Sequence, residues 1–193
     1  MYMPCIINRR DFKEYAVMIP LVESDEGMHI CFEVRAEGIP QGGEICFPGG
    51  AIEPGEDECS AALRETKEEL GVNIADTDYK GALLSVSGRL IHVFTGRAVN
   101  WDGRVHEPGE VANSFSIAIE WFKKTPVEKY AVEHIVSSRR QDSGEILLPA
   151  DELGLPAVYN DKWKVYDTPV YLWRSPYGFI WGITAAIIYH IFC

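Results

Sequence analysis

Three glutamates lie close together in a segment that has the periodicity of a helix. At about 100° per residue, Glu65, Glu68 and Glu69 fall within one third of the helix circumference. Like charges at this spacing repel by roughly a few tenths of a kcal/mol per pair, and no lysine follows four residues after any of them. Mg²⁺ or Mn²⁺ suits a ligand set made only of carboxylate oxygens. The segment therefore predicts either a metal site or a solvated acidic face with Arg64 and Lys67 as surface partners.

The residues around these glutamates favour the metal site. Gly50, Glu56 after five intervening residues, and the sequence RETKEELGV at 64–72 together resemble the complete Nudix box, the signature of a hydrolase superfamily. Thr66 departs from the pattern, at a position where an aliphatic residue is more usual, and it belongs to the apolar side of the predicted helix. So many matched positions weigh against an acidic globular protein with a coincidental box.

The resemblance implies a role for each polar residue of the box. Glu65, Glu68 and Glu69 would bind Mg²⁺ or Mn²⁺, which would neutralise a diphosphate and lower the pKa of an attacking water. Arg64 would orient a carboxylate through a charge-assisted hydrogen bond, without touching the substrate. Gly50 would let the loop backbone approach the phosphates closely. The chain is thus expected to be a metal-dependent diphosphatase.

A general base is expected outside the box. Several Nudix enzymes carry an extra glutamate in a loop before a late strand, and Glu110 ahead of residues 113–119 resembles that arrangement. The alternative is a surface glutamate beside Glu107 and Gly109, because an acidic loop residue needs no special reason.

Two further segments resemble the coenzyme A pyrophosphatases of this superfamily. The first begins at Arg35 and continues through Gly43 to the sequence FPGG at 47–50, and the second is IWGITA at 180–185. The family pattern has an arginine midway in the first segment, where this chain is one residue shorter and carries IPQ at 39–41. The substrate-binding residues that the resemblance implies are Arg35, Phe47, Gly49 and Gly50.

The implied reaction is hydrolysis of CoA or an acyl-CoA to 3′,5′-ADP and (acyl-)4′-phosphopantetheine. The 3′-phosphate calls for a basic partner, for which Arg35, Arg89, Arg139 and Arg140 are available. Because one arginine is missing, a pyrophosphatase acting on another nucleoside diphosphate derivative, such as ADP-ribose, remains an alternative. A non-catalytic nucleotide-binding domain is a third hypothesis, and the intact carboxylate set argues against it.

The surrounding elements must position these residues. The grouping of strands, with one helix inserted and one at the end, predicts an α/β fold with a mixed sheet, in agreement with the α/β/α sandwich of the Nudix fold. Without repeats or linkers, residues 1–193 are predicted to form one domain, with the box at 50–72. Strands are expected at 14–22, 28–35, 79–86, 90–99, 114–119, 130–137 and 145–148, and helices at 57–70, 120–124 and about 176–193. The strands at 130–137 and 145–148 are expected to pair as a hairpin around the turn residues 141–144.

Composition limits the partners. The 193 residues include 18 Lys and Arg against 29 Asp and Glu, a net charge of −11, which excludes general attraction to a nucleic-acid polymer. A small phosphorylated ligand can still bind through a divalent cation. The oligomeric state is left open, a homodimer included.

The cysteines and the C-terminal segment bear on location. Five widely spaced cysteines without a Cys-x-x-Cys pair, and the lack of a secretory signal at residues 1–10, lead us to expect a cytoplasmic protein. Residues 177–193 contain no Asp, Glu, Lys or Arg. This uncharged segment of 17 residues just reaches the minimum length of a membrane-spanning helix. Gly178, Gly182 and the absence of a following basic cluster favour a buried helix over a membrane anchor.

Overall fold

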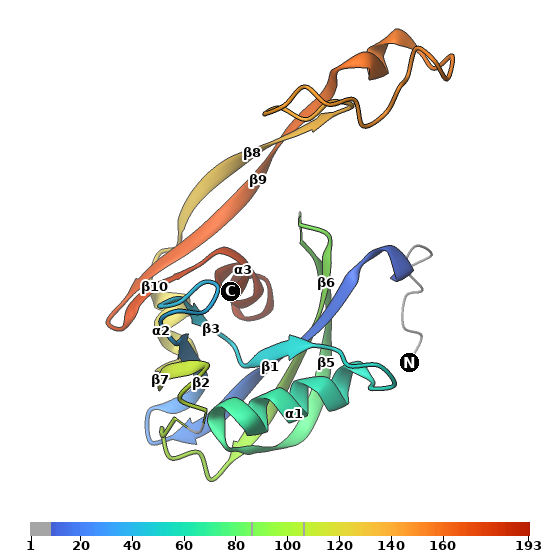
Figure 1. Ribbon diagram of the computed structural model, residues 1–193. Coiled ribbons are helices and arrows are strands. Elements are labelled where there is room, and N and C mark those ends of the chain that lie inside the picture. Colours follow the sequence, from blue (N-terminus) through green and yellow to red (C-terminus); the bar gives the residue numbers. More distant parts are fainter. Residues whose placement is uncertain (1–8, 86, 106) are drawn as a thin grey trace. The chain divides into compact units, whose positions relative to one another are not determined.

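The computed structural model describes residues 9–193 except Val86 and His106 (Figure 1). Cys5, Val86 at the end of one predicted strand, and His106 therefore lie outside the described residues. The chain divides into two compact units, of which one contains the residues up to Val127 together with Leu172–Cys193, and the other contains Glu128–Tyr171. The organisation of residues 1–193 as one functional domain stays a prediction.

The described chain contains three α-helices, two short 3₁₀ helices and ten strands. The helices are η1 (Arg9–Asp11), α1 (Glu58–Leu70), α2 (Ile119–Lys124), η2 (Ala157–Asn160) and α3 (Gly182–Phe192). The strands are β1 (Lys13–Ser24), β2 (Gly27–Arg35), β3 (Ile45–Cys46), β4 (Gly49–Ala51), β5 (Asn73–Leu84), β6 (Arg89–Val99), β7 (Val111–Ala118), β8 (Glu128–Ser137), β9 (Lys162–Ser175) and β10 (Gly178–Trp181).

The main sheet of the first unit is mixed, as predicted. Its order is β3-β2-β1-β6-β5, with β4 also paired to β1 and β7 to β2. Strand β1 runs parallel to β6, with Val17 opposite Val93, and antiparallel to β2 and β4. Because β4 pairs with β1 at Tyr15–Val17, the glycines of the FPGG sequence are fixed against the centre of the sheet.

Helix α1 confirms the predicted helix at 57–70. The Asp57 side chain accepts the Ser60 backbone N–H at 2.8 Å, which caps the first turn. At the other end, Gly71 adopts a left-handed conformation with φ of +67°, and its N–H closes on the Lys67 carbonyl. Buried alanines, including Ala62, pack this helix against Met18 of β1 and its neighbours. The sheet thereby holds one side of α1 while the glutamates lie on another.

A second core is built from aromatic side chains. Phe32 of β2 stacks on Phe47 at 5.3 Å between ring centroids and on Phe115 at 5.7 Å. Phe122 of α2 meets Phe32 and also contacts the edge of Trp173, a fully buried side chain. This core joins α2 and the end of β9 to the sheet.

The C-terminal segment differs from the predicted helix at about 176–193. Helix α3 begins only at Gly182, and Gly178–Trp181 form β10, paired with Leu172–Ser175. Residues Phe179 and Trp181 are exposed while Ile180 between them is buried, which is the alternation of a strand. Among the described residues, no helix combines the length and the apolar character needed to cross a bilayer.

The second unit also corrects the predicted strand pairing. Strand β8 pairs with β9 rather than with residues 145–148, which contribute only an isolated bridge between Ile146 and Arg139. The hydrogen bond from the Arg140 N–H to the Glu145 carbonyl keeps 140–145 as a local turn. The fourteen residues of β9 offer β8 a much longer pairing edge, so the short segment does not become its partner.

Candidate active site

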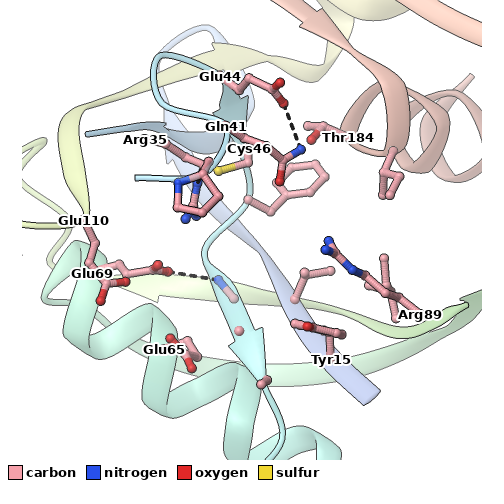
Figure 2. Close-up of a pocket in the computed structure, with 18 of the residues that line it drawn as sticks. Tyr15, Arg35, Gln41, Glu44, Cys46, Glu65, Glu69, Arg89, Glu110 and Thr184 are labelled. Carbon is pink, nitrogen blue, oxygen red and sulfur yellow. Dashed lines mark hydrogen bonds between the residues drawn. The ribbon is translucent and has the colours of Figure 1, made fainter. Parts of the chain in front are cut away.

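One cavity of about 980 Å³ in the first unit collects the nine residues predicted for catalysis, metal binding and substrate binding (Figure 2). This volume is at the upper end of the usual range for small-molecule sites. The predicted residues that line it are Arg35, Phe47, Gly49, Gly50, Arg64, Glu65, Glu68, Glu69 and Glu110.

The three box glutamates differ in their surroundings. Glu68 is exposed, Glu65 is half-buried, and Glu69 is only 3% exposed. The Glu69 carboxylate accepts the Gly49 backbone N–H at 2.9 Å, which ties α1 to the start of β4. Burial, together with the nearby Glu33 carboxylate, raises the pKa of Glu69 to about 9. A solvated acidic face does not fit a carboxylate buried to this extent.

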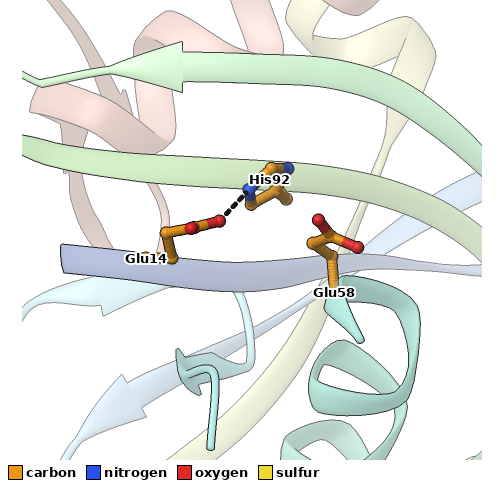
Figure 3. Close-up of side chains that lie close together, drawn as sticks. All are labelled: Glu14, Glu58 and His92. Carbon is orange, nitrogen blue, oxygen red and sulfur yellow. Dashed lines mark hydrogen bonds and ion pairs between the residues drawn. The ribbon is translucent and has the colours of Figure 1, made fainter. Parts of the chain in front are cut away.

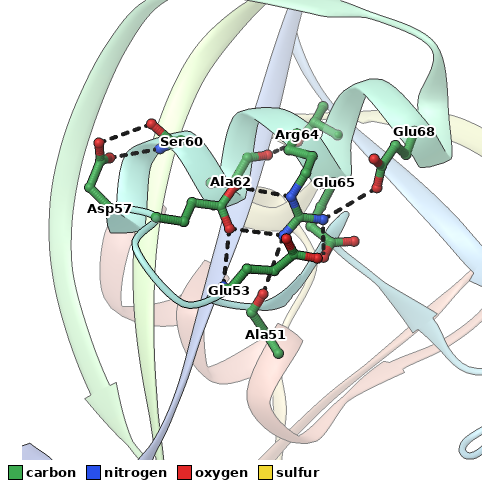
Figure 4. A network of polar contacts seen from close by, with 10 residues as sticks. Ala51, Glu53, Asp57, Ser60, Ala62, Arg64, Glu65 and Glu68 are labelled. Carbon is green, nitrogen blue, oxygen red and sulfur yellow. Dashed lines mark hydrogen bonds and ion pairs between the residues drawn. The ribbon is translucent and has the colours of Figure 1, made fainter.

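Arg64 has the contacts expected of a positioning residue (Figure 4). Its guanidinium donates to both carboxylate oxygens of Glu56, at 3.0 and 3.1 Å, and to Glu65 at 2.8 Å. A longer bond of 3.3 Å reaches Glu68. The pKa of Glu65 is nevertheless raised, because burial outweighs the attraction of Arg64. One guanidinium therefore links three carboxylates and leaves Glu69 uncompensated.

Glu33 is a site neighbour that the sequence analysis missed. This residue of β2 is 1% exposed, and its Oε1 accepts a hydrogen bond from the Cys46 thiol at 3.2 Å. Apart from the carboxyl group of Glu69, which can share a proton with it, its other oxygen, Oε2, has no hydrogen-bond partner among the described residues. Burial raises the pKa of Glu33 to about 7. The available signal was strand alternation, which places Glu33 on the same face as Arg35.

These observations fit a divalent cation. Glu33 and Glu69 are two buried carboxyl groups in contact, and Oε2 of Glu33 has no hydrogen-bond donor among the described residues other than the Glu69 carboxyl group itself. A buried carboxylate is costly unless a cation or a proton compensates it. The donor set at this end of the cavity consists of carboxylate oxygens, the type that Mg²⁺ and Mn²⁺ prefer.

The two glycines of the loop leave room where side chains would collide. A Cβ atom at Gly50 would lie 2.2 Å from Oε1 of Glu65, and one at Gly49 would lie 2.4 Å from the Ala16 carbonyl oxygen. Gly49 is thus required for the contact of β4 with β1. Gly50 is required for the position of the Glu65 carboxylate.

Glu110 lies at the carboxylate end of the cavity. Its backbone is fixed by a hydrogen bond from the Ala36 N–H to the Glu110 carbonyl at 2.7 Å. The side chain is exposed and lies beside Glu69 in Figure 2. Its negative charge contributes to the raised pKa of both Glu65 and Glu69. The structure therefore brings the proposed base to the box carboxylates.

The opposite side of the cavity is cationic and apolar. Arg89, at the start of β6, lies over the ring of Tyr15 with 5.4 Å to the ring centroid. Helix α3 and the residue before it contribute a further wall to the lining, made by Trp181, Gly182, Ile183, Thr184 and Ile187.

The segment that lacks the family's arginine also borders the cavity. The Nε group of Arg35 donates to the Pro40 carbonyl at 3.1 Å. Gln41 lines the cavity, and its amide donates to Glu44 at 3.3 Å. Of the other arginines considered for a phosphate, Arg139 and Arg140 belong to the second unit and are absent from the cavity lining.

A second group of possible metal ligands lies at the first turn of α1 (Figure 3). It consists of Glu14, Glu58 and His92, with the His92 Nε2 and the Glu14 carboxylate 3.0 Å apart. Arg9 donates hydrogen bonds to both glutamates, and Tyr79 contacts the other ring nitrogen of the histidine. The guanidinium of Arg9 already supplies the positive charge here, so we assign this group to an ion-pair network.

Comparisons with known proteins give the family of this arrangement. The NUDIX domain model matches residues 13–141. "Nudix hydrolase 3" of Caenorhabditis elegans is 30% identical over 183 residues, which cover 90% of this chain and 70% of that protein. The mouse "Peroxisomal coenzyme A diphosphatase NUDT7" is 36% identical over 62 residues, 31% of this chain and 26% of that protein. The NUDIX domain of Shewanella oneidensis NrtR, solved with ADP ribose, has a TM-score of 0.50 and 14% identity, covering 60% of this chain and 78% of that one.

Proposed function

The chain belongs to the Nudix hydrolase family, and we propose that its substrate is CoA or an acyl-CoA. The products would be 3′,5′-ADP and (acyl-)4′-phosphopantetheine. The family assignment supports a diphosphatase, and the substrate is inferred from the residues that line the cavity.

One observation carries this inference. The segments that resemble CoA pyrophosphatases lie more than one hundred residues apart, yet residues from each of them line the same cavity as the box. Arg35 and the 47–50 loop lie on one side, and Trp181–Thr184 of the C-terminal segment on another. CoA has a diphosphate, which suits the wall formed by Arg35 and the 47–50 loop. It also has a long pantetheine arm, which suits the wall formed by Trp181–Thr184.

The carboxylates would hold the metal that the reaction requires. Glu65, Glu68 and Glu69 are the proposed ligands, in agreement with the buried, uncompensated carboxyl groups around Glu69. A bound Mg²⁺ would neutralise diphosphate oxygens and lower the pKa of an attacking water. Gly49 holds the Glu69 carboxylate through its N–H, and Arg64 holds Glu65, so the ligands are fixed before substrate arrives.

Glu110 is the proposed general base. It is exposed to the cavity beside Glu69, where its carboxylate could accept a proton from the attacking water. Arg35 is proposed to bind substrate, because it lines the cavity and its Nε–H alone is engaged with the Pro40 carbonyl. Phe47, Gly49 and Gly50 would form the adjoining backbone surface against the phosphates.

The test is a product analysis with CoA and Mg²⁺ in ¹⁸O-labelled water. Formation of 3′,5′-ADP and 4′-phosphopantetheine supports the proposal, and the labelled product identifies the phosphorus that is attacked. ADP-ribose is assayed beside it at the same concentration. Efficient cleavage of ADP-ribose with no turnover of CoA would overturn the substrate assignment.

A second candidate, a pyrophosphatase of another nucleoside diphosphate derivative, is favoured by one observation. Gln41 and Pro40 border the cavity in the segment where CoA pyrophosphatases carry an additional arginine. The same pair of assays separates this candidate from the first. Nucleotide binding without turnover of any diphosphate would instead indicate a non-catalytic domain.

We also propose a cytoplasmic location. The four described cysteines, including the buried Cys31, are free thiols, in agreement with a reducing compartment. The name of the mouse relative places that protein in peroxisomes. Imaging of the tagged chain, with the tag at either end in turn, tests the location.

A further inference from the structure

We propose that Arg89, supported by Tyr15, binds a second anionic group of the substrate, a phosphomonoester separate from the diphosphate. This inference rests on the proposed function, because it assigns the 3′-phosphate of CoA to one residue. The sequence left four arginines as candidates for this role, and the cavity selects among them.

The charges of the cavity lining single out Arg89. Three arginines line the cavity. Arg64 is engaged by Glu56, Glu65 and Glu68, so its positive charge is already matched. Arg35 is hydrogen-bonded to a backbone carbonyl and attracts the buried Glu33. Arg89 has no carboxylate partner among the described residues, which leaves its charge available to a ligand.

The position of Arg89 is fixed by its strand and by the aromatic ring. Its backbone N–H bonds the Ser85 hydroxyl at 3.1 Å, and the Ser85 N–H bonds the Arg89 carbonyl at 2.8 Å. On the neighbouring parallel strand, Lys13 lies opposite Arg89 and Tyr15 lies two residues further on. Stacking on a ring engages the face of a guanidinium, and the N–H groups at its edge stay free to bind a phosphate with two hydrogen bonds.

Arg89 also lies at a suitable place for a second anion. In Figure 2 it is on the opposite side of the cavity from Glu69 and Glu110, with its guanidinium directed into the cavity. The diphosphate and a phosphomonoester would therefore bind to different walls. Arg139 and Arg140 are engaged elsewhere, since Arg139 donates to the Asn160 carbonyl and Arg140 pairs with Glu145 in the second unit.

The experiment compares CoA with 3′-dephospho-CoA, which differ only in this phosphate. For the wild type we expect a higher kcat/KM with CoA. In Arg89→Gln, kcat/KM for CoA should fall by about 10- to 100-fold, the scale of a lost hydrogen bond between charged groups, while that for 3′-dephospho-CoA stays within about twofold. Arg89→Lys should retain part of the preference, because a lysine keeps the charge and loses the two-pronged geometry.

The matched control is Arg97→Gln on the same strand. Arg97 is exposed, pairs with Asp76 at 3.0 Å and is absent from the cavity lining, so this variant should keep the wild-type preference. Binding is measured by calorimetry with 3′,5′-ADP and 5′-ADP, and the first should lose affinity in Arg89→Gln while the second does not.

The outcomes separate this inference from the proposed function. An equal fall of kcat/KM for both substrates in Arg89→Gln, or unchanged kinetics for both, would overturn the role of Arg89 while CoA hydrolysis stands. If the wild type hydrolyses neither substrate, the proposed function fails. A preference for 3′,5′-ADP that depends on Arg89 would still support the anion site in that case, and its absence would overturn both.

Discussion

Helix α1 carries clusters of carboxylates at both ends, and the two clusters are balanced in different ways. At its first turn, Glu58 lies with Glu14 and His92, and Arg9 donates to both glutamates. Two to three turns later, about 10 Å or more along the axis, Glu65 shares Arg64 with its neighbours. Glu69 forms no ion pair with a cationic side chain among the described residues. In the first cluster, Arg9 neutralises the negative charge of the glutamates. In the second, the buried carboxyl group of Glu69 requires a proton or a metal ion to neutralise it.

This difference teaches that a count of nearby carboxylates does not identify a metal site. The first cluster has ligand atoms at metal-binding spacing, within 4.8 Å of one another, but an arginine already lies among them. The second has a buried carboxyl group, Glu69, beside Glu33, whose Oε2 has no hydrogen-bond donor among the described residues other than Glu69 itself. Compensation of charge, more than proximity, separates the ion-pair network at the first turn from the proposed divalent-cation site.

The largest difference in kcat between the two clusters is expected when one carboxylate in each is neutralised. Glu69→Gln should lower Mg²⁺-dependent kcat by at least about 100-fold, the scale for losing one preorganised charged group of an active site. Glu58→Gln should leave kcat within about twofold, because Glu58 does not line the cavity. Steady-state hydrolysis of CoA measures both. Full activity of Glu69→Gln would show that the metal site is wrongly assigned.

A smaller effect is expected from pH in the metal-free protein. The folded-state pKa of Glu69, about 9, lies above its ordinary value of 4.5, so the folded protein retains a proton that the unfolded chain loses. The associated stability is fully present below about pH 4.5 and is lost as pH rises through about 9. The Tm of the metal-free protein should therefore fall across this range relative to Glu69→Gln.

Metal and a variant of the first cluster provide the controls for this measurement. Saturating Mg²⁺ should remove most of the difference between the wild type and Glu69→Gln, because the cation takes the place of the proton. Glu58→Gln should keep the wild-type dependence. A wild-type Tm with the same pH dependence as Glu69→Gln would contradict the assigned charge balance.

The smallest effect is expected from Arg9→Ala. Its removal leaves Glu14 and Glu58 without their shared cation, but the Arg9 side chain is 45% exposed and solvent screens the pair. The free energy of unfolding should fall by no more than about 1 kcal/mol, with kcat unchanged. Urea denaturation and CoA hydrolysis measure the two quantities. A loss of activity as large as that of Glu69→Gln would remove the distinction between the clusters.

The sequence was sufficient for the features that depend on local spacing. Helix α1 was predicted at 57–70 to within one residue, because the residues that end it, Asp57 and Gly71, act on their own neighbours in the chain. Burial of Glu69 was not predicted, since it depends on the N–H of Gly49, twenty residues away. The role of Glu33 depends in the same way on the pairing of β2 with β3, which brings it opposite Cys46.

The missed strands have a related cause. Residues 178–181 are apolar and short, and such a run has no period that distinguishes a strand from the start of a buried helix. Their pairing with Leu172–Ser175 decides the matter through long-range hydrogen bonds. Likewise, no sequence pattern within 128–148 indicated that β8 pairs with β9 and not with the nearer residues 145–148.

The position of the second unit within the chain has a consequence for synthesis. Residues 128–171 are translated between the two parts of the first unit. These two parts contact each other through, among others, the hydrogen bond from Trp173 Nε1 to the Thr125 carbonyl at 3.0 Å. A ribosome-bound chain therefore contains the complete carboxylate wall long before it contains Trp181 and Ile183. Domains generally fold as units, so the first unit can complete its fold only after Trp181 and Ile183 have been synthesised, although its carboxylate wall is made earlier.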